Sequence, residues 1–263
     1  MSVRMGMVAT GVLLRRELVR MVRQPSRVVA TLGTVGLFWL VIGSGLSGSF
    51  VMPGDDGAGY ASYLVPGMVT MGVLFGTVFA SISLIQDRHS GFLQSALVSP
   101  APRWACVAAK AGAGAIVGGV QSVLILLAGW MVGVESGVGG LVLASVAATV
   151  TALGVVSLGL ALAWWVDSVS GFHGLMNLVL TPMWLLSGAL FPAEGAAEWL
   201  GWVMRVNPLH WCTIAMGDAL GIGSRGSGEV ALAWLGMAAF AAVSLGGAMV
   251  IAERCRARVA VSA

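Results

Sequence analysis

The chain has few side chains of the kinds that perform chemistry, and their spacing matches no phosphate loop or metal site. The single lysine, Lys110, lies in Ala-Ala-Lys-Ala-Gly, which lacks the Gly-x-x-x-x-Gly-Lys-Ser/Thr pattern that cradles nucleotide phosphates. The cysteines and histidines are scattered, without the close spacing of metal ligands or of a disulfide framework. They are Cys106, Cys212, Cys255, His89, His173 and His210. The sequence therefore predicts that this chain hydrolyses no ATP and binds no metal or cofactor.

One short pattern suggests nucleophilic catalysis. Gly45-Leu46-Ser47-Gly48 matches the Gly-x-Ser-Gly sequence of rhomboid-type intramembrane proteases, whose serine needs a histidine on a neighbouring helix to accept its proton. Ser47 stands near the end of the first apolar run, and none of the apolar runs has a central histidine. Ser-Gly pairs are also common in a chain with 38 glycines. The sequence favours coincidence and predicts no catalytic residue.

The apolar composition explains why reactive side chains are rare. Hydrophobic residues make up 58% of the 263 residues and charged residues 10%, against about 25% charged in soluble proteins. Asp, Glu, Lys and Arg are missing from 28–54, 57–86, 111–134, 136–166, 168–193 and 230–252. Each run exceeds the roughly 20 apolar residues that a membrane-crossing helix needs. The chain is predicted to be an all-α membrane protein, which excludes a soluble enzyme, a nucleic-acid binder and a disordered chain.

These runs define the predicted domain organisation. Residues 1–27 form a cytoplasmic N-terminal region, 28–252 a six-span transmembrane domain and 253–263 a cytoplasmic tail. The spans are expected at about 28–48, 62–86, 108–133, 138–165, 171–191 and 229–252.

Basic residues predict the orientation. Twelve of the fourteen lie before the first span, between the second and third, or after the sixth; only Arg205 and Arg225 lie on the other side. Loops rich in Lys and Arg stay in the cytoplasm, so both termini are predicted to be cytoplasmic. The excess of Arg over Lys, with abundant Gly and Ala, points to a bacterial chain. We therefore expect a multi-pass protein of the bacterial cytoplasmic (inner) membrane.

The segment from Val8 to Gln24 predicts a basic amphipathic helix that ends at a proline. The polar arc of its helical wheel holds Arg16, Glu17, Arg20 and Arg23. Such a helix lies in the membrane interface, with its apolar face toward the acyl chains and its arginines toward lipid phosphates. The alternative is a plain positive flank of the first span.

Two inner connections hold further candidate residues. After the second predicted span, Asp87-Arg88-His89-Ser90-Gly91 leads into a stretch from Phe92 to Val98 that could form a short amphipathic helix before two prolines break it. Gly91 can adopt a positive φ and would turn the backbone sharply. The connection from Asp167 to Gly171 is very short. An ordinary solvated loop is the alternative for the first connection.

Residues 192–228 form a long outer connection between the fifth and sixth predicted spans. Trp199 and its apolar neighbours are mixed with charged residues, and Asn207-Pro208 interrupts the segment. The segment is too apolar for a free loop and too broken for a span. It therefore predicts two short helices that dip into the outer leaflet, with a surface loop as the alternative.

Three stretches resemble the type-two ABC transporter permeases, the six-span membrane subunits of exporters for drugs, lipids and polysaccharides. The stretch from Tyr60 to Gly67 is similar to the family's entry to its second span. The inner loop is similar through Asp87 to Leu93, Ser99-Pro100, Arg103 and Lys110. The outer segment is similar through Ser187 to Pro192, Trp199-Leu200 and Asn207-Pro208-Leu209. Within the family, the drug-resistance-like exporters are the most similar.

The resemblance implies a homodimer or heterodimer of permeases in the lipid bilayer, with two copies of a separate ATPase subunit on its inner face. ATP and Mg would bind to that partner, and closure of the ATPases would move substrate outward. The docking surface would comprise the interfacial helix and Asp87, Arg88, Gly91, Phe92, Leu93, Arg103 and Asp167. The outer re-entrant segment would include Ser187, Gly188, Pro192, Trp199, Asn207 and Pro208. The substrate and the residues that bind it stay open.

Other classes also stay open. A non-transport membrane protein, such as a protease-like protein or a scaffold, would co-purify without an ATPase. A secondary transporter is disfavoured because coupled carriers usually keep ionisable residues in mid-span, where this sequence has none. Nucleic acid is not an expected partner.

Overall fold

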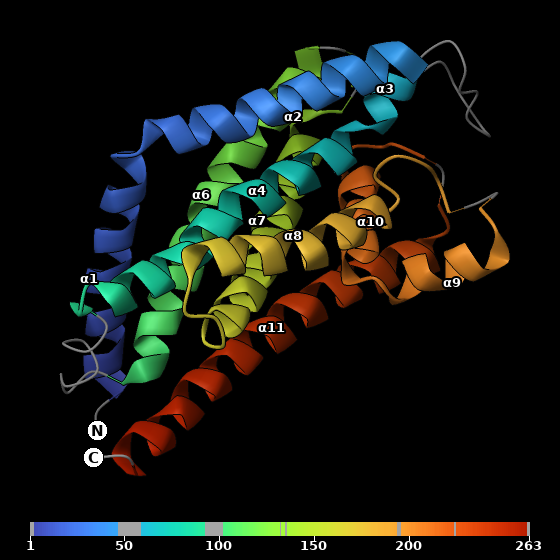
Figure 1. Ribbon diagram of the computed structural model, residues 1–263. Coiled ribbons are helices and arrows are strands. Elements are labelled where there is room, and N and C mark those ends of the chain that lie inside the picture. The colour runs from blue at the N-terminus through green and yellow to red at the C-terminus, as the bar shows by residue number, and fades with distance from the viewer. Residues whose placement is uncertain are drawn as a thin grey trace.

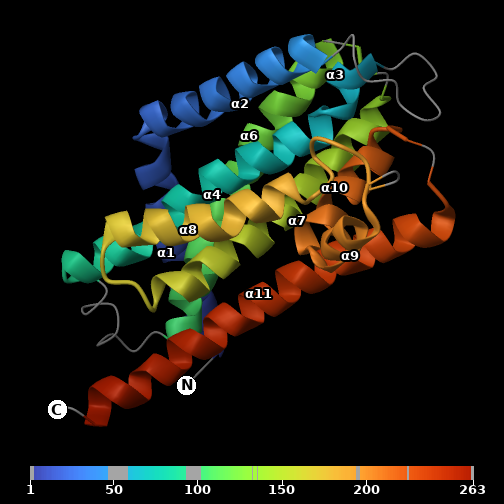
Figure 2. The same ribbon diagram turned by 45° about the vertical axis from the view of Figure 1, so that its right-hand side comes forward.

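A computed structural model describes residues 3–46, 59–92, 102–131, 133–134, 136–193, 196–223 and 225–261. Every regular element in these ranges is an α-helix, which confirms the all-α prediction. The long helices are bundled side by side, and α1 crosses them at one end of the bundle (Figure 1 and Figure 2).

The chain enters through α1 (Val3–Val22), which starts five residues before the predicted interfacial helix. After two intervening residues α2 (Pro25–Leu46) begins, so the proline expected to end the first helix opens the second, where its fixed φ suits the first turn. The remaining helices are α3 (Gly59–Tyr63), α4 (Val65–His89), α6 (Arg103–Met131), α7 (Val138–Ala163), α8 (Val169–Leu185), α9 (Glu198–Val206), α10 (Pro208–Ala219) and α11 (Ser227–Val261).

Within the described residues, five helical segments are long and apolar enough to cross a membrane, and each corresponds to a predicted span. They are Pro25–Leu46, Gly59–His89, Arg103–Met131, Val138–Ala163 and Ser227–Arg254. The remaining predicted span, 171–191, is different because α8 ends at Leu185 and the chain continues in turns and bends. Its 17 residues measure about 25 Å, near the lower limit for a transmembrane helix.

The central helix is α4, which packs against α2, α6, α7 and α8. In its most apolar window 83% of the residues are buried, against 17% for α2 and 22% for α11. Small residues let the inner helices approach closely: a Cβ added to Gly114 of α6 would lie 2.7 Å from Val156 of α7. Without a hydrophobic force between helices in lipid, close packing of this kind holds a bundle together.

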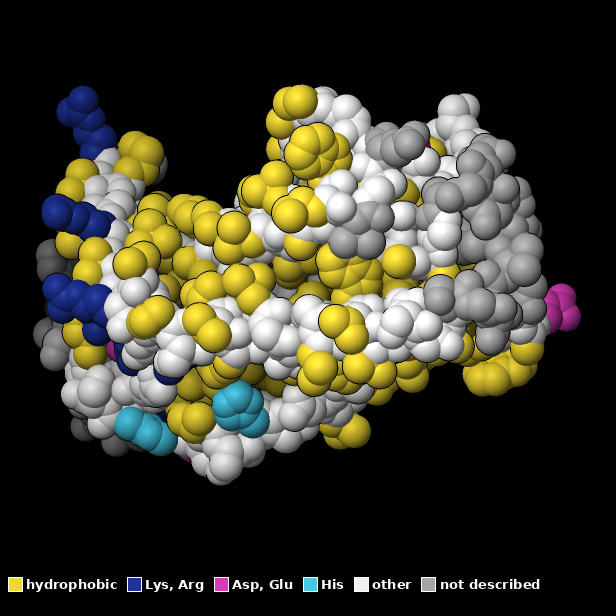
Figure 3. Space-filling model, turned by 90° about the horizontal axis from the view of Figure 1, so that it is seen from above, with side chains coloured by type: hydrophobic (Ala, Val, Ile, Leu, Met, Phe, Trp, Pro, Cys, Tyr) yellow, Lys and Arg dark blue, Asp and Glu magenta, His cyan; other side chains and the backbone are white. Residues whose placement is uncertain are grey.

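The two ends of the bundle differ in charge. Both chain termini lie at the end crossed by α1, here called the α1 end, and α9 and α10 lie at the opposite end, the α10 end (Figure 1 and Figure 2). On the face seen in Figure 3, the basic side chains gather at the α1 end, while apolar side chains cover the flank between the ends. This arrangement fits an apolar belt in the bilayer with one basic rim.

We expect single cysteines at the two ends to be labelled from opposite sides of the membrane. Ser90 follows α4 at the α1 end, Glu198 begins α9 at the other end, and both are exposed. In a chain whose native cysteines are replaced, a charged maleimide should label Glu198→Cys in intact cells. It should label Ser90→Cys only after permeabilisation, and labelling of both from one side would contradict this topology.

Candidate functional sites at the two ends of the bundle

At the α1 end, α1 packs against α6 with its polar arc turned toward the bundle. Gly6 lies against Trp104 at the start of α6, where any added side chain would clash. On the opposite side of α1, Val12 and Val22 are 66% and 76% exposed. The outward apolar row suits a helix in the membrane interface, as the sequence predicts.

The arginines of α1 have a different partner from the one expected. The carboxylate of Asp87, only 2% exposed, receives hydrogen bonds from Arg16 at 3.3 and 3.4 Å and from Arg20 at 3.0 Å. Arg20 also donates to Gln86 at 2.6 Å. The expectation that Arg16 and Arg20 face lipid phosphates is therefore wrong, because both neutralise a buried carboxylate of α4. Arg23, just past the end of α1, is exposed.

Two members of this charged cluster were not recognised in the sequence. Lys110 of α6 and Glu17 of α1 are each 2% exposed. The Lys110 ammonium donates to Glu17 at 3.0 Å, to Asp87 at 2.5 Å and to Ser83 at 2.9 Å. The sequence did contain a sign of this contact. Consecutive antiparallel helices joined by a loop place Asp87 and Lys110 at similar depth, and a buried lysine there needs an acidic partner.

Arg88, the next residue of α4, points instead to the connection between α7 and α8. Its guanidinium pairs with Asp167 at 2.5 Å and donates to the carbonyl of Ala163 at 3.2 Å. A ring nitrogen of His89 lies 2.7 Å from the Asp167 carbonyl oxygen. The structure thus brings together Arg88 and Asp167, two of the residues proposed for docking, whereas Asp87 faces α1 and α6. The Asp167 side chain stays 89% exposed.

The backbone turns at Gly91, directly after α4, as the sequence predicts. Gly91 has φ +73°, a conformation that costs other residues energy, and its N–H donates to the Arg88 carbonyl at 3.2 Å. Phe92 then lies under Arg16, whose guanidinium carbon is 3.6 Å from the ring centroid. Leu93 and the rest of the predicted short helix lie outside the described residues. Arg103 opens α6 and is partly buried.

At the α10 end, the chain after α8 is held in place by side chains of the α3–α4 region. The Tyr60 hydroxyl donates to the carbonyl of Leu190 at 2.9 Å, and the Tyr63 hydroxyl to that of Gly188 at 2.8 Å. Gly188 itself has φ +84°. The predicted outer residues Ser187 and Gly188 are therefore part of an ordered turn that ends α8.

The two short helices predicted in the outer segment are present as α9 and α10, separated by Asn207. The side-chain oxygen Oδ1 of Asn207 accepts from the N–H of Leu209 at 3.1 Å and so caps α10, and Pro208 occupies the first position of that helix. The amide of Asn207 donates to Met183 of α8 at 2.5 Å. Most of α10 is buried, whereas Trp199 of α9 is exposed. Asn207 thus ties the outer segment to α8.

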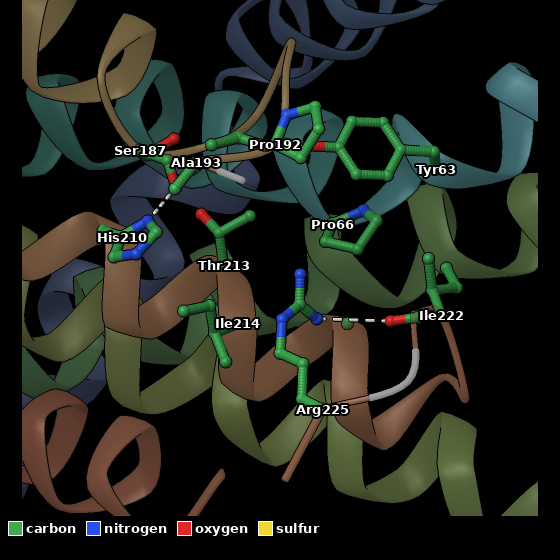
Figure 4. Close-up of a pocket in the computed structure, with 12 residues that line it drawn as sticks. Tyr63, Pro66, Ser187, Pro192, Ala193, His210, Thr213, Ile214, Ile222 and Arg225 are labelled. Atoms are coloured by element: carbon green, nitrogen blue, oxygen red, sulfur yellow. Dashed lines mark hydrogen bonds between the residues drawn. The ribbon is translucent and has the colours of Figure 1, made fainter. Parts of the chain in front are cut away.

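A small cavity lies between this turn, α4 and α10 (Figure 4). Pro192, Ser187 and Gly188 line it with His210, and Arg225 points into it from the connection before α11. Its volume of about 20 Å³ holds about one water molecule. The cavity is therefore too small for a drug-sized ligand.

A larger groove opens on the flank of the bundle over α4. It has a volume of about 180 Å³ and is lined from α2, α4 and α8. Phe38, Phe75 and Trp184 give it an aromatic wall, and Asn177 and Thr181 of α8 contribute its polar groups. The groove combines apolar area with a few polar groups, as small-molecule sites do.

Long apolar helices with one basic end define a multi-pass membrane protein. The model of the ABC-2 type transporter family matches residues 8–220, and the chain belongs to this family, whose members are membrane subunits of transporters. It is 28% identical over 157 residues to "Probable multidrug ABC transporter permease YbhR" of Escherichia coli (strain K12) and of Escherichia coli O157:H7. The alignment covers 59% of this chain and 42% of those proteins.

The close contact between α4 and the turn after α8 predicts a sensitive glycine. A Cβ on Gly67 would lie 2.6 Å from the Cβ of Ala189 and 2.7 Å from its backbone. We expect Gly67→Ala to destabilise the purified protein by about 1–3 kcal/mol, because backbone atoms must move. Gly246→Ala in α11 is the matched control, since nothing lies within 4 Å of its added Cβ. Equal thermal unfolding of both variants in detergent would contradict the contact.

Proposed function

We propose that the chain is the permease subunit of an ATP-driven ABC exporter in the bacterial inner membrane. It crosses the membrane six times with α8 as the fifth span, keeps both termini in the cytoplasm, and works with two copies of a separate ATPase. The observation that carries the proposal is the corner at the α1 end, where Arg88 pairs with Asp167 beside the turn at Gly91. The family of the chain supports the same assignment.

The corner has the properties that an ATPase-docking surface needs. Two inner connections far apart in sequence are fixed to each other by an ion pair, and the exposed Asp167 side chain is available to a partner. Gly91, with its positive φ, turns the backbone sharply at the end of α4. A movement of the docked ATPase would therefore be transmitted to α4, α7 and α8 together.

We place the interface with a second permease on the face of the bundle that carries the groove over α4. Two copies facing each other through α2 and α8, as a homodimer or heterodimer, would enclose a path with twice the groove's lining. The α10 end would then hold the outer gate of this path, to be opened by ATPase closure. The name of the Escherichia coli relatives supports a drug-like substrate, and a lipid or glycan also fits a path with an aromatic wall and a few polar groups.

The purified chain alone should hydrolyse no ATP, and hydrolysis should appear with a co-purified ATPase subunit. The physical reason is that the chain has no phosphate-binding loop. ATPase activity of proteoliposomes with and without the partner measures this, and a partner variant lacking its catalytic acidic residue is the control. Failure of any ATPase to co-purify from the native host, or hydrolysis by the permease alone at the rate of the complex, would contradict the proposal.

Coupling should depend on the turn at Gly91. A β-branched residue at a positive φ costs on the order of 1–2 kcal/mol, enough to displace the loop but not to unfold the bundle. Gly91→Val should therefore lower transport and substrate-stimulated ATP hydrolysis several-fold, and Phe92→Ala should act in the same direction. Gly139→Val, at an exposed position with open space around it, is the matched control. If both test variants keep full partner binding and transport, this corner is not the coupling site.

A further inference from the structure

Five charged side chains from three helices meet behind the docking corner. Arg16, Glu17 and Arg20 come from α1, Asp87 from α4 and Lys110 from α6. Three cations face two carboxylates, so the cluster carries one net positive charge. Both carboxylates and the lysine are almost fully buried, while Arg16 and Arg20 are about one-third exposed.

Lys110 is the residue that joins the three helices. Its ammonium has three donors, and each is used on a different partner: Glu17 of α1, Asp87 of α4 and Ser83 one turn earlier on α4. Glu17 accepts from both Lys110 and Arg16 through the same oxygen, Oε1, and its other oxygen has no described partner. Arg16 belongs to α1 itself, so the ionic contact that ties Glu17 to another helix is the one from Lys110.

Arg16 extends this link to the docking corner. It contacts Glu17 at 2.9 Å, Asp87 at 3.3 Å and the ring of Phe92 at 3.6 Å. Phe92 is the first residue past the Gly91 turn. A continuous chain of contacts thus runs from the start of the inner loop through Arg16 and Glu17 to Lys110 on α6.

Stabilisation of the helix packing alone is a poor explanation for this charged cluster. Removing charges from solvent costs so much that apolar residues of similar size often hold helices together equally well or better. What an ionic cluster adds is a defined geometry, because charge pairing is satisfied only in one arrangement of the helices. The cluster therefore has the properties of a positioning device.

We propose that Lys110 is a positioning residue for energy coupling: by binding Glu17 and Asp87 together, it makes α1 move with the loop-bearing end of α4 and with α6. The interfacial helix is then a working part of the coupling element and not only an anchor in the lipid. This inference rests on the proposed function, since coupling requires an ATPase to act on the corner.

A double-variant experiment separates positioning from charge balance. Lys110→Met and Glu17→Gln each remove one partner, and Lys110→Met/Glu17→Gln removes both while Asp87 keeps Arg16 and Arg20. Each variant is reconstituted with its co-purified ATPase, and thermal unfolding, basal hydrolysis and the ratio of substrate moved to ATP hydrolysed are measured. Arg15→Met, an exposed loss of charge on the same helix, is the control.

Positioning and charge balance predict different behaviour of the double variant. On our proposal it regains thermal stability relative to the single variants but keeps a transport-to-hydrolysis ratio at least about fivefold below wild type, within the usual range of coupling between sites. Arg15→Met stays within twofold of wild type. Recovery of the ratio along with stability in the double variant would overturn the proposal, because charge balance alone would then explain the cluster.

Hydrogen exchange tests, without any ATPase, whether Lys110 holds α1 against the bundle. In the purified permease, the double variant should exchange amide hydrogens faster than wild type over the second half of α1, and Arg15→Met should not. Unchanged exchange in that half of α1 would overturn the proposal that Lys110 holds this helix, even if the complex is active. Absence of ATP-driven transport by the wild-type complex would instead overturn the proposed function. The exchange result would then still decide whether Lys110 holds α1.

Discussion

Burial of the Asp87 carboxylate at the end of α4 is the constraint on which the α1 end depends. An uncompensated charge in that position would cost several kcal/mol, so cations must be supplied from elsewhere in the chain. Arg16 and Arg20 come from α1 and Lys110 from α6, and the need for them fixes where both helices lie. Arg88, one residue later, faces the other way and fixes the connection between α7 and α8. Two adjacent residues of one helix thus organise most of the α1 end.

The opposite end is organised by backbone groups instead of charges. Once α8 stops at Leu185, the carbonyls of Met183, Gly188 and Leu190 need donors, and Asn207, Tyr63 and Tyr60 provide them. Neutral hydrogen bonds of this kind are individually modest. Contacts of this kind at the α10 end are compatible with the movable outer gate of the proposed exporter, and the charged cluster at the α1 end with its rigid coupling corner.

The composition was enough to predict the membrane class, the helical fold and five spans. A long run without charges is stable in a bilayer as a helix, which satisfies its own backbone hydrogen bonds. The helices on either side of Asn207-Pro208 and the sharp turn at Gly91 were also predictable, since each depends on local backbone chemistry. The length of α8 was not predicted, because its apolar run continues past Leu185. In the structure the helix stops before a turn in which Gly188 has a positive φ and Tyr63 donates to the Gly188 carbonyl. The roles of Glu17 and Lys110 depend on which helices pack together, and a helical wheel of α1 alone assigned its arginines to lipid.

The shared partners of Lys110 also restrict how this region can diverge among homologous proteins. Replacing the lysine alone leaves Glu17 and Asp87 with fewer cations, and replacing Glu17 alone leaves an excess of positive charge in the interior. Each single step passes through a less stable intermediate, so accepted changes should occur together or in a fixed order. Three positions separated by up to 93 residues in sequence then evolve as one unit, whereas exposed neighbours such as Arg15 are free to drift.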